Sequence, residues 1–598
     1  MKNTEGFDRF DALNANYDKQ PVIEVADGAG ACAAGWRAVV GRLKEAVEAA
    51  PSPGDRAFVM SIECYTGVFE DEIAEALQAL HPVRIVRSGQ AFFSDELIEQ
   101  KLAPFNGGED PVFGRMNELT MDELLDPQRV EALAAEIGRI EAGLVIVLGN
   151  GASRLHPGDL LVYADLARWE AQQRMRRDAI SNLGVENRCL KWSLQYKRAY
   201  FTDWRICDRL KRELMAHWDF VLATNQPGEP RLAEGCVVRA ALEAAAHRPF
   251  RVVPFFDPAP WGGQWMKVFC DLDPEPVNYG WCFDCVPEEN SLLLRFGETL
   301  MELPSINLVF QEPSALLGEN VHARFGAEFP IRFDLLDTMG GGNLSFQVHP
   351  LAEYIREHFG MGYTQDESYY LLDAGEGGAV YLGTREGVDA DEMIADLEAA
   401  RRGEKPFDDQ RFVERWPAKK HDHFLIPAGT CHCGGANTMV LEISATPYIF
   451  TFKMWDWERL GLDGLPRPVN LARGAENIDW ERSTGWVREN LVNRIEPLDE
   501  GEDWREERTG LHELEFIETR RHWFTGPVAH HTGGGVNVLN LVEGREAIVE
   551  SPVGAFEPFV VHYAETFIVP AAVGAYTIRP HGESEGKECA TLKAYVRT

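Results

Sequence analysis

The feature that most constrains this chain is a change in sequence pattern near residue 255. Before this point, short apolar runs alternate with helical patterns. After it, short runs rich in Phe, Val, Leu and Tyr follow one another and are separated by Gly and Pro. Alternating strands and helices are typical of a parallel sheet, whereas closely spaced short strands indicate a sandwich or barrel. The sequence therefore predicts an α/β half followed by a β half, with the boundary at Pro254, Pro258 and Pro260.

Length and charge restrict the classes of function. A chain of 598 residues corresponds to about three or four domains. The formal net charge of −36 at pH 7 argues against nucleic acids and anionic membrane surfaces as partners, because binding them needs clustered cations. No apolar run reaches the ~18 residues of a membrane helix, and residues 1–16 contain no signal-peptide core. The 11 cysteines are scattered and odd in number, so we expect no disulfide framework and a cytoplasmic location.

The N-terminal half shows the strand–helix alternation clearly. Ala57–Ile62 is an apolar run followed by a turn at Thr66–Gly67, and Leu144–Leu148 is a continuous apolar run of the kind that forms a buried parallel strand. A further strand is expected at Leu160–Ala164 and a helix at Trp169–Asp178. These segments predict a parallel sheet covered by helices.

The order of these segments resembles that of uridine kinase and phosphoribulokinase-type P-loop proteins, over residues 21–253 after an extension at 1–20. The stretches that carry the resemblance are Gly143–Asn150, Leu161–Asp165 and Arg174–Asp178. In that family the last of these segments belongs to an arginine-bearing lid over the nucleotide. The resemblance implies a P-loop-like α/β domain.

The phosphate-binding turn of this domain is degenerate. A working P-loop carries GxxxxGK[ST], whose backbone amides and lysine hold the phosphates. Here Val68 stands at the lysine position, Phe69 at the Ser or Thr position, and the carboxylate of Glu63 would repel a phosphate. The arginines of the lid segment are more typical of a solvated helix face; they are Arg174, Arg176 and Arg177. We therefore expect no kinase activity and no bound nucleotide.

Two motifs in the C-terminal half are of a metal-binding type. In Leu344–Pro350, Gln347 and His349 are two residues apart and therefore point to one face of a strand, where an amide oxygen and an imidazole can hold a metal. In the second motif, the turn Pro427–Gly429 delivers His432, which resembles the second motif of the cupin family. Taken alone, the first motif is more typical of a polar pair on a sheet face.

Two carboxylates and two cations follow the same strand-rich pattern. Glu367 begins one predicted strand, and Glu442 lies within the apolar run Val440–Ile443. Lys453 and Arg459 follow further along the chain, in the stretch Phe452–Arg459. Each of these residues, taken by itself, is more typical of a solvated side chain than of a catalytic one.

Taken in order, these motifs resemble the type I phosphomannose isomerases, which are zinc enzymes of the cupin superfamily. The resemblance also includes Pro260–Gly263 and extends over half of the chain. It implies a double cupin of jelly-roll barrels with a small helical insertion. We expect a metal-binding barrel at 254–490, an acidic linker at 491–511 and a second, metal-free barrel at 512–598.

The resemblance also implies a set of site residues. The metal ligands are Gln347, His349, Glu367 and His432, the catalytic residues are Arg459 and Glu442, and the substrate-binding residues are Ser345, Lys453 and Gln365. Such nitrogen and oxygen ligands suit one zinc ion, and another divalent metal would also fit. In the second barrel, His530 and His531 have no carboxylate at a suitable spacing, so we expect no metal there.

We therefore expect a zinc-dependent aldose–ketose isomerase that acts on mannose 6-phosphate, or a related sugar phosphate, through a cis-enediolate. Zinc would polarise the sugar oxygens, and Arg459 would stabilise the developing negative charge. Burial on an apolar strand would raise the pKa of Glu442 toward neutrality and suit it to proton transfer, with metal-bound water as the rival base.

Other interpretations stay open. Gln365 stands where the family carries a lysine, which favours a non-phosphorylated sugar as the substrate. Val68 favours a non-catalytic sugar sensor made of a pseudokinase and a pseudo-isomerase, although a sensor need not keep all four metal ligands. A cupin dioxygenase would usually carry more histidines and iron, and a working kinase fused to an isomerase would need the missing lysine. The sequence does not indicate the oligomeric state.

Overall fold

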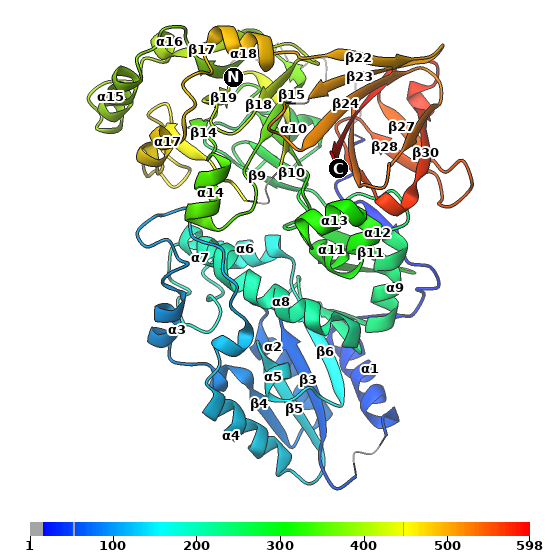
Figure 1. Cartoon of the computed structure of the whole chain (residues 1–598). Coiled ribbons are helices and arrows are strands. Elements are labelled where there is room, and N and C mark those ends of the chain that lie inside the picture. The colour runs from blue at the N-terminus through cyan, green and yellow to red at the C-terminus, as the bar shows by residue number, and fades with distance from the viewer. Residues whose placement is uncertain (1–15, 52–53, 446–447, 511) are drawn as a thin grey trace.

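The computed structural model describes residues 16–51, 54–445, 448–510 and 512–598. An α/β part formed by the N-terminal half lies at one end of the molecule, and a β part lies at the other (Figure 1). The predicted extension at residues 1–20 lies mainly outside the described residues.

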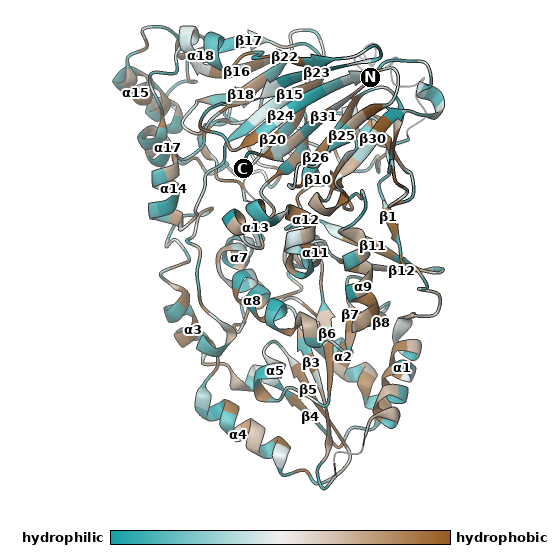
Figure 2. Cartoon of the chain, turned by 45° about the vertical axis from the view of Figure 1, so that its right-hand side comes forward, coloured by the Kyte–Doolittle hydropathy of each residue, from teal (hydrophilic) through white to brown (hydrophobic). Residues whose placement is uncertain are grey.

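Among the described residues, the α/β part contains one seven-stranded sheet. Its strands, in spatial order, are β2 (Cys32–Ala34), β8 (Arg231–Glu234), β7 (Phe220–Ala223), β6 (Leu160–Asp165), β3 (Phe58–Cys64), β5 (Leu144–Gly149) and β4 (Arg84–Arg87). The strands from β7 to β4 are parallel, as the alternation of strands and helices predicts, and β8 and β2 add an antiparallel edge. The hydrophobic residues of β3 and β5 are buried in the centre of this sheet (Figure 2).

Helices flank the sheet and reach toward the β part. They are α1 (Gly35–Ala49), α2 (Glu70–Leu77), α3 (Asp95–Leu102), α4 (Pro127–Gly138), α5 (Ala152–Leu155), α6 (Arg168–Arg176), α7 (Trp192–Arg198), α8 (Trp204–Leu214) and α9 (Gly235–Ala245). Local signals start some of them: the Asp126 side chain accepts a hydrogen bond from Gln128 N, and Pro127 occupies the first turn of α4. Figure 1 shows α6 and α7 at the end of the α/β part that faces the β part.

The turn after β3 is closed by an arginine. Arg174 is fully buried, its guanidinium lies over the Phe69 ring, and it donates a 2.9 Å hydrogen bond to the Gly67 carbonyl. The prediction that the arginines lie on a solvated helix face is therefore wrong for Arg174, because α6 packs this face onto the turn. Arg177 does lie mainly in solvent. The positive charge of Arg174 stabilises the backbone of the turn from within the protein.

The first barrel is built from two antiparallel sheets. One contains β18 (His423–Ile426), β15 (Glu367–Ala374), β20 (Thr438–Ser444), β13 (Arg332–Asp337), β10 (Trp281–Cys285) and β9 (Phe255–Asp257). The other contains β17 (Val413–Pro417), β16 (Ala379–Thr384), β19 (His432–Gly434), β14 (Phe346–Val348) and β21 (Phe452–Trp455). Around these sheets lie α10 (Trp265–Phe269), α14 (Ala352–Phe359), α15 (Ala390–Arg401), α16 (Asp409–Phe412), α17 (Leu471–Asn477) and α18 (Thr484–Asn490).

The second barrel also has two antiparallel sheets. They contain β22 (Glu496–Glu500), β23 (Trp504–Gly510), β24 (Ile517–Phe524), β31 (Cys589–Val596), β26 (Asn537–Glu543) and β29 (Thr566–Val569), and β25 (Val528–His531), β30 (Ala575–Pro580), β27 (Glu546–Glu550) and β28 (Phe559–His562). The segment 491–511, expected to be an acidic linker, instead supplies β22 and β23. Cross-strand ion pairs such as Arg508–Glu496 and Arg520–Glu506 (3.1 Å) offset its acidic charge and allow it to pair.

The small helical insertion lies between the two parts. It consists of α11 (Ile306–Gln311), α12 (Pro313–Leu317) and α13 (Glu319–Phe325). Just before it, β11 (Ser291–Phe296) and β12 (Thr299–Pro304) form a sheet with β1 (Val22–Glu24), which runs parallel to β11. The chain thus returns from the β part to its own N-terminal segment, and the two parts are joined at more than one point.

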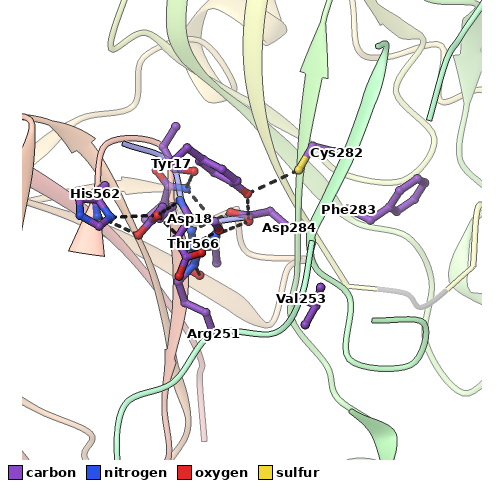
Figure 3. Close-up of polar contacts among 12 residues, drawn as sticks. Tyr17, Asp18, Arg251, Val253, Cys282, Phe283, Asp284, His562 and Thr566 are labelled. Atoms are coloured by element: carbon purple, nitrogen blue, oxygen red, sulfur yellow. Dashed lines mark hydrogen bonds and ion pairs between the residues drawn. The ribbon is translucent and has the colours of Figure 1, made fainter. Parts of the chain in front are cut away.

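A buried polar cluster joins the two barrels (Figure 3). Arg251 forms ion pairs with Glu565 (2.8 Å) and Asp284 (3.3 Å). Asp284 also accepts hydrogen bonds from the Tyr17 hydroxyl and from Thr566 N (2.7 Å). The partners come from segments that are far apart in sequence, so the cluster fixes the second barrel against the first.

Buried polar groups also hold the α/β part against the β part. Lys211 of α8 donates hydrogen bonds to Asp165 at the end of β6 (2.8 Å) and to Asn307 of α11 (3.0 Å), and Asn307 donates to Asp165 (2.8 Å). Arg168 of α6 donates to the carbonyl of Glu288 (2.8 Å). These contacts set the position of α6 in front of the first barrel.

Within the described parts of the chain, none of the helices combines the length and apolarity that crossing a bilayer requires.

Candidate metal centre

Three buried side chains converge inside the first barrel. His349 Nε2 lies 3.1 Å from Glu367 Oε2, and His432 Nε2 lies 3.0 Å from Glu367 Oε1. In the described residues, this is the one group of three His, Cys, Asp or Glu side chains whose ligand atoms all lie within 4.8 Å of one another. Two imidazoles and a carboxylate at such distances suit one divalent metal ion.

Strand pairing explains this convergence. Gln347 of β14 pairs with His432 of β19 in one sheet, while Glu367 begins β15 in the opposite sheet, so the centre lies between the two sheets. The turn before β19 depends on Gly429, which has a φ of 91°. A Cβ atom at this glycine would lie 2.8 Å from Leu351 Cδ2, so a larger residue would be strained and would crowd its neighbour.

The outer nitrogens of both histidines are held by backbone carbonyls. His349 Nδ1 lies 2.9 Å from Phe450 O, and His432 Nδ1 lies 2.8 Å from Thr430 O. These carbonyls require a proton on each Nδ1, which leaves the lone pair of each Nε2 directed into the centre. In the described chain, no hydrogen bond reaches His349 Nε2 or Glu367 Oε1. Each of these atoms instead lies within ion-pair distance of another side chain of the group. These residues therefore fit a metal ion.

Gln347 completes the set of four predicted ligands. Its amide nitrogen lies 3.2 Å from His432 Nε2. A half-turn of the amide exchanges its nitrogen and oxygen and directs Oε1 to the same place. The structure thus brings Gln347, His349, Glu367 and His432 together.

Gln365 lies behind the metal ligands and not in the pocket beside them. It is 3% exposed, its Nε2 donates to Glu367 Oε2 (2.9 Å), and its Oε1 accepts from Phe450 N (2.8 Å). Both ends of the amide are therefore engaged in orienting Glu367 and the strand that holds His349. This position differs from the substrate contact expected for Gln365, because its amide is buried, bonds to Glu367 and Phe450, and is not among the groups that line the pocket.

Two further carboxylates, those of Glu442 and Asp334, lie on the same face as Glu367. Glu442 of β20 pairs with Asp334 of β13 on one side and with Tyr369 of β15 on the other, so these side chains share the interior face with Glu367. Burial raises the pKa of Glu442 well above its usual range, and the charges of Glu367 and Asp334 raise it further. Burial also raises the pKa of Asp334 to about 7, although Arg332 forms a 2.7 Å ion pair with it.

The two predicted cations lie in different places: Lys453 lines the pocket, and Arg459 belongs to a buried polar cluster around Asp456. Lys453 of β21 lies opposite Gln347 in the strand register, and burial, together with Arg467, lowers its pKa to about 7. Arg459 instead pairs with Asp456 (2.6 Å), which also accepts a hydrogen bond from Ser345 Oγ (2.9 Å). Ser345 and Arg459 thus lie beside Lys453 but do not line the pocket next to the metal ligands.

A pocket of about 230 Å³ lies between the α/β part and the first barrel, and the four candidate ligands are not among its lining residues. Two lining residues lie close to those ligands: Lys453 pairs with Gln347 in the strand register, and Thr451 Oγ1 lies 3.5 Å from the outer nitrogen, Nδ1, of His349. Arg332 lines the pocket from the opposite sheet. The outer wall of the pocket includes residues of α6 and α7.

Sequence reasoning missed Arg332 and Asp334 as neighbours of the centre. A usable signal was present, because the two charges alternate with apolar residues in β13, so both point to one face. It also missed the contribution of α6 and α7, which no local pattern indicates.

In the second barrel, His530 lies beside His522, with ring centroids 4.4 Å apart, and stacks on Tyr576.

The fold and the site define a double-barrel protein with a His–Glu–His group that fits a metal ion. The chain is 26% identical over 235 residues to mannose-6-phosphate isomerase ManA of Bacillus subtilis, which is 39% of this chain and 68% of that protein. It is 29% identical over 222 residues to the mannose-6-phosphate isomerase of Streptococcus mutans, covering 36% of this chain and 63% of that one. These similarities confirm the predicted resemblance for part of the chain. The chain is therefore an enzyme of the isomerase class.

Two solved structures are similar to part of this chain. The mannose 6-phosphate isomerase from Bacillus subtilis has a TM-score of 0.47 and 18% identity, covering 58% of this chain and all (100%) of that one. A zinc-bound mannose 6-phosphate isomerase has a TM-score of 0.44 and 14% identity, covering 59% and 100%. A family described as a domain of unknown function (DUF8485) matches residues 35–247. The resemblance of the N-terminal half to P-loop kinases finds no support in these comparisons.

Proposed function

We propose that the chain is a zinc-dependent aldose–ketose isomerase that interconverts mannose 6-phosphate and fructose 6-phosphate, or a related pair of sugar phosphates. The observation that carries the proposal is the convergence of His349, Glu367 and His432 inside the first barrel. A sugar-sized pocket is lined by Lys453, which pairs with Gln347 next to this group. The similarity to enzymes named as mannose-6-phosphate isomerases supports the substrate class. Two neutral nitrogens and a carboxylate, with Gln347 beside them, are ligands that zinc accepts.

A zinc ion bound there would supply Lewis-acid polarisation of the sugar oxygens. The chain's own residues would then transfer the proton. Glu442 shares the interior face with Glu367 and is the proposed acid/base. In this step a proton leaves C2, its bonding electrons stay in the cis-enediolate, the same proton or another returns to C1, and a hydroxyl proton moves from O2 to O1. Each atom is conserved, as an isomerisation requires.

The cations near β21 would recognise the anionic end of the substrate. We assign Lys453 to direct contact, because it lines the pocket. Ser345 and Arg459 would act from behind it, since Asp456 engages both. Arg459 would then raise the local positive potential and stabilise negative charge without touching the reacting carbons.

The test is an isomerase assay of the zinc-loaded protein with mannose 6-phosphate and with free mannose, beside a His432→Ala variant. We expect turnover of the phosphate ester, and its loss in the variant. Turnover of free mannose alone would favour a non-phosphorylated sugar, a second candidate supported by Gln365, which occupies the place of the family's lysine and bonds to Glu367. Zinc binding without turnover of either sugar would contradict both and favour a sensor.

A further inference from the structure

The pocket between the α/β part and the first barrel has an outer wall to which the isomerase-like part of the chain is not the sole contributor. Trp169 and Arg176 come from α6, and Trp192 and Tyr196 come from α7. These residues belong to the region that matches the domain of unknown function, residues 35–247. The α/β part therefore contributes directly to the shape and chemistry of the pocket.

The wall is a continuous aromatic surface that crosses from one part to the other. Trp169 stacks on Phe255 with centroids 4.2 Å apart and an interplanar angle of 18°, and Phe255 stacks on Phe283 at 4.5 Å and 18°. The Arg176 guanidinium lies over both the Trp169 ring (5.1 Å) and the Trp192 ring (4.6 Å). A sugar has an apolar C–H face that packs on aromatic rings, and hydroxyls that require polar groups at the edge.

The charges of the outer wall are already paired with one another. Arg176 makes two hydrogen bonds to Asp257 (2.8 and 2.7 Å), and Glu289 accepts from Gln172 (2.7 Å) and Tyr196 (2.7 Å). Such a surface attracts a phosphate weakly, because each cation has a carboxylate beside it, but it offers donors and acceptors to hydroxyl groups. Among the described lining residues, Lys453 is the basic side chain for which no ion pair is seen.

The outer wall is also held rigidly. The buried contacts of Arg168 with Glu288, and of Lys211 with Asp165 and Asn307, fix α6 and α8 to the β part. Gln172 and Tyr196 add hydrogen bonds across the same boundary to Glu289. A pocket wall that is ordered before the ligand arrives loses little entropy on binding.

We propose that the α/β part is a substrate-specificity element: its α6–α7 wall binds the uncharged, hydroxylated portion of the sugar. The volume of about 230 Å³ is below the ~300 Å³ lower end of drug-sized pockets, so it fits one sugar-sized group and not a nucleotide. The inference rests on the proposed function for the identity of the sugar, but the wall can be tested by binding alone.

Trp192 is the residue to change, because it is 36% exposed and its truncation leaves the buried core intact. The matched control is Trp36→Ala, a partly buried tryptophan of the same α/β part that bonds to Glu72 and does not line the pocket. The full-length, zinc-loaded protein is titrated calorimetrically with mannitol 6-phosphate, which cannot isomerise, and with mannitol. We expect Trp192→Ala to raise the Kd of mannitol 6-phosphate about 10-fold, with unchanged zinc content and an unchanged control.

The outcomes separate this inference from the proposed function. Equal Kd values for Trp192→Ala and the unaltered protein would overturn the inference even if mannose 6-phosphate is isomerised. Failure of both probes to bind the unaltered protein would overturn it as well. Binding that depends on Trp192 in a protein that does not isomerise mannose 6-phosphate would support the wall and contradict the proposed reaction.

Discussion

The carboxyl edge of the N-terminal sheet and the interior of the first barrel both bury charged side chains, but they use them differently. At the sheet edge each charge has a complementary partner: Glu63 accepts hydrogen bonds from Gly151 N (2.6 Å) and Ser153 N (2.9 Å), and Asp165 accepts from Lys211. In the barrel, His349 Nε2 and Glu367 Oε1 converge without such partners. Burial of charge with complete pairing indicates a structural role, whereas convergence with unused lone pairs indicates a binding centre.

The contacts at the sheet edge also explain how the turn after β3 is stabilised. Glu63, which we expected to repel a phosphate, is directed at the start of α5, and burial raises its pKa to about 7 despite the amides that lower it. Arg174 holds the turn from the other side through Gly67 O. Both polar groups that could have faced a ligand are engaged within the protein. The edge therefore acts as a support for α6 and α8.

The largest expected effect comes from removing a metal ligand. Glu367→Gln and His432→Ala should each lower kcat/KM by at least about 10³-fold, equivalent to about 4 kcal/mol, because each removes a donor from the converging group. Zinc per chain, measured by mass spectrometry, should fall in parallel. His423→Leu is the matched control, since His423 is a fully buried histidine of the same barrel outside the converging group. Full activity in a zinc-free His432→Ala protein would contradict the metal centre.

The next effect is on stability at the sheet edge. Asp165→Ala should lower the free energy of unfolding by about 3–5 kcal/mol, because it leaves the buried Lys211 ammonium without its carboxylate. Denaturant unfolding followed by circular dichroism measures this loss, while kcat/KM per folded molecule should stay unchanged.

A double variant sharpens this result. Asp165→Leu combined with Lys211→Met removes both charges and should recover most of the lost stability. If Asp165→Ala instead abolished activity in a protein that stays folded, the sheet edge would be a functional site and the contrast between the two regions would fail.

A smaller effect is expected behind the metal ligands. Gln365→Leu should weaken zinc binding about 10–100-fold, as loss of an outer hydrogen bond to a ligand commonly does, because Gln365 orients Glu367 Oε2. Competition with a chromogenic chelator measures the zinc affinity. The stability of the metal-free protein serves as the control for a general packing defect. Unchanged zinc affinity would mean that Glu367 is oriented by its strand alone.

The sequence predicted the parts of the fold and site that depend on local pattern. Strand alternation put Gln347 and His349 on one face, and the turn at Gly429 placed His432, as the structure has them. What the sequence could not predict depends on contacts between distant segments. The burial of Arg174 arises because α6 packs against the turn after β3. The strands in 491–511 pair with each other, and β23 also pairs with β24, which lies outside that segment.

The interior of the barrel was predicted less completely for the same reason. Glu442 and Lys453 were identified from a family resemblance, whereas Arg332 and Asp334 become neighbours of the centre only when β13 pairs with β20. The wall formed by Trp169 and its neighbours arises where the α/β part and the β part meet. Neither hydrophobic periodicity nor motif spacing within one segment contains this information.

The smallest predicted effect tests whether a buried barrel residue outside the centre behaves as a structural group. Burial, with the nearby charge of Arg521, lowers the pKa of His423 to about 3, below its usual value near 6.5. The unfolded chain therefore binds a proton that the folded chain refuses, so stability is retained above pH 6.5 and is lost as the pH falls below it. Between pH 7.5 and 5.5 this residue alone should cost about 1.4 kcal/mol.

His423→Leu should remove that share of the pH dependence. Urea unfolding of the variant and of the unaltered protein at both pH values isolates it, because all other titrating groups, including those of the metal centre, are common to the two proteins. The slope of the free energy of unfolding against pH gives the number of protons taken up on unfolding. At the acid end this number should differ by close to one between the two proteins. An identical loss of stability in both proteins would show that His423 is protonated in the folded barrel. The barrel interior would then tolerate a charge without a partner, whereas the buried charges at the sheet edge have partners.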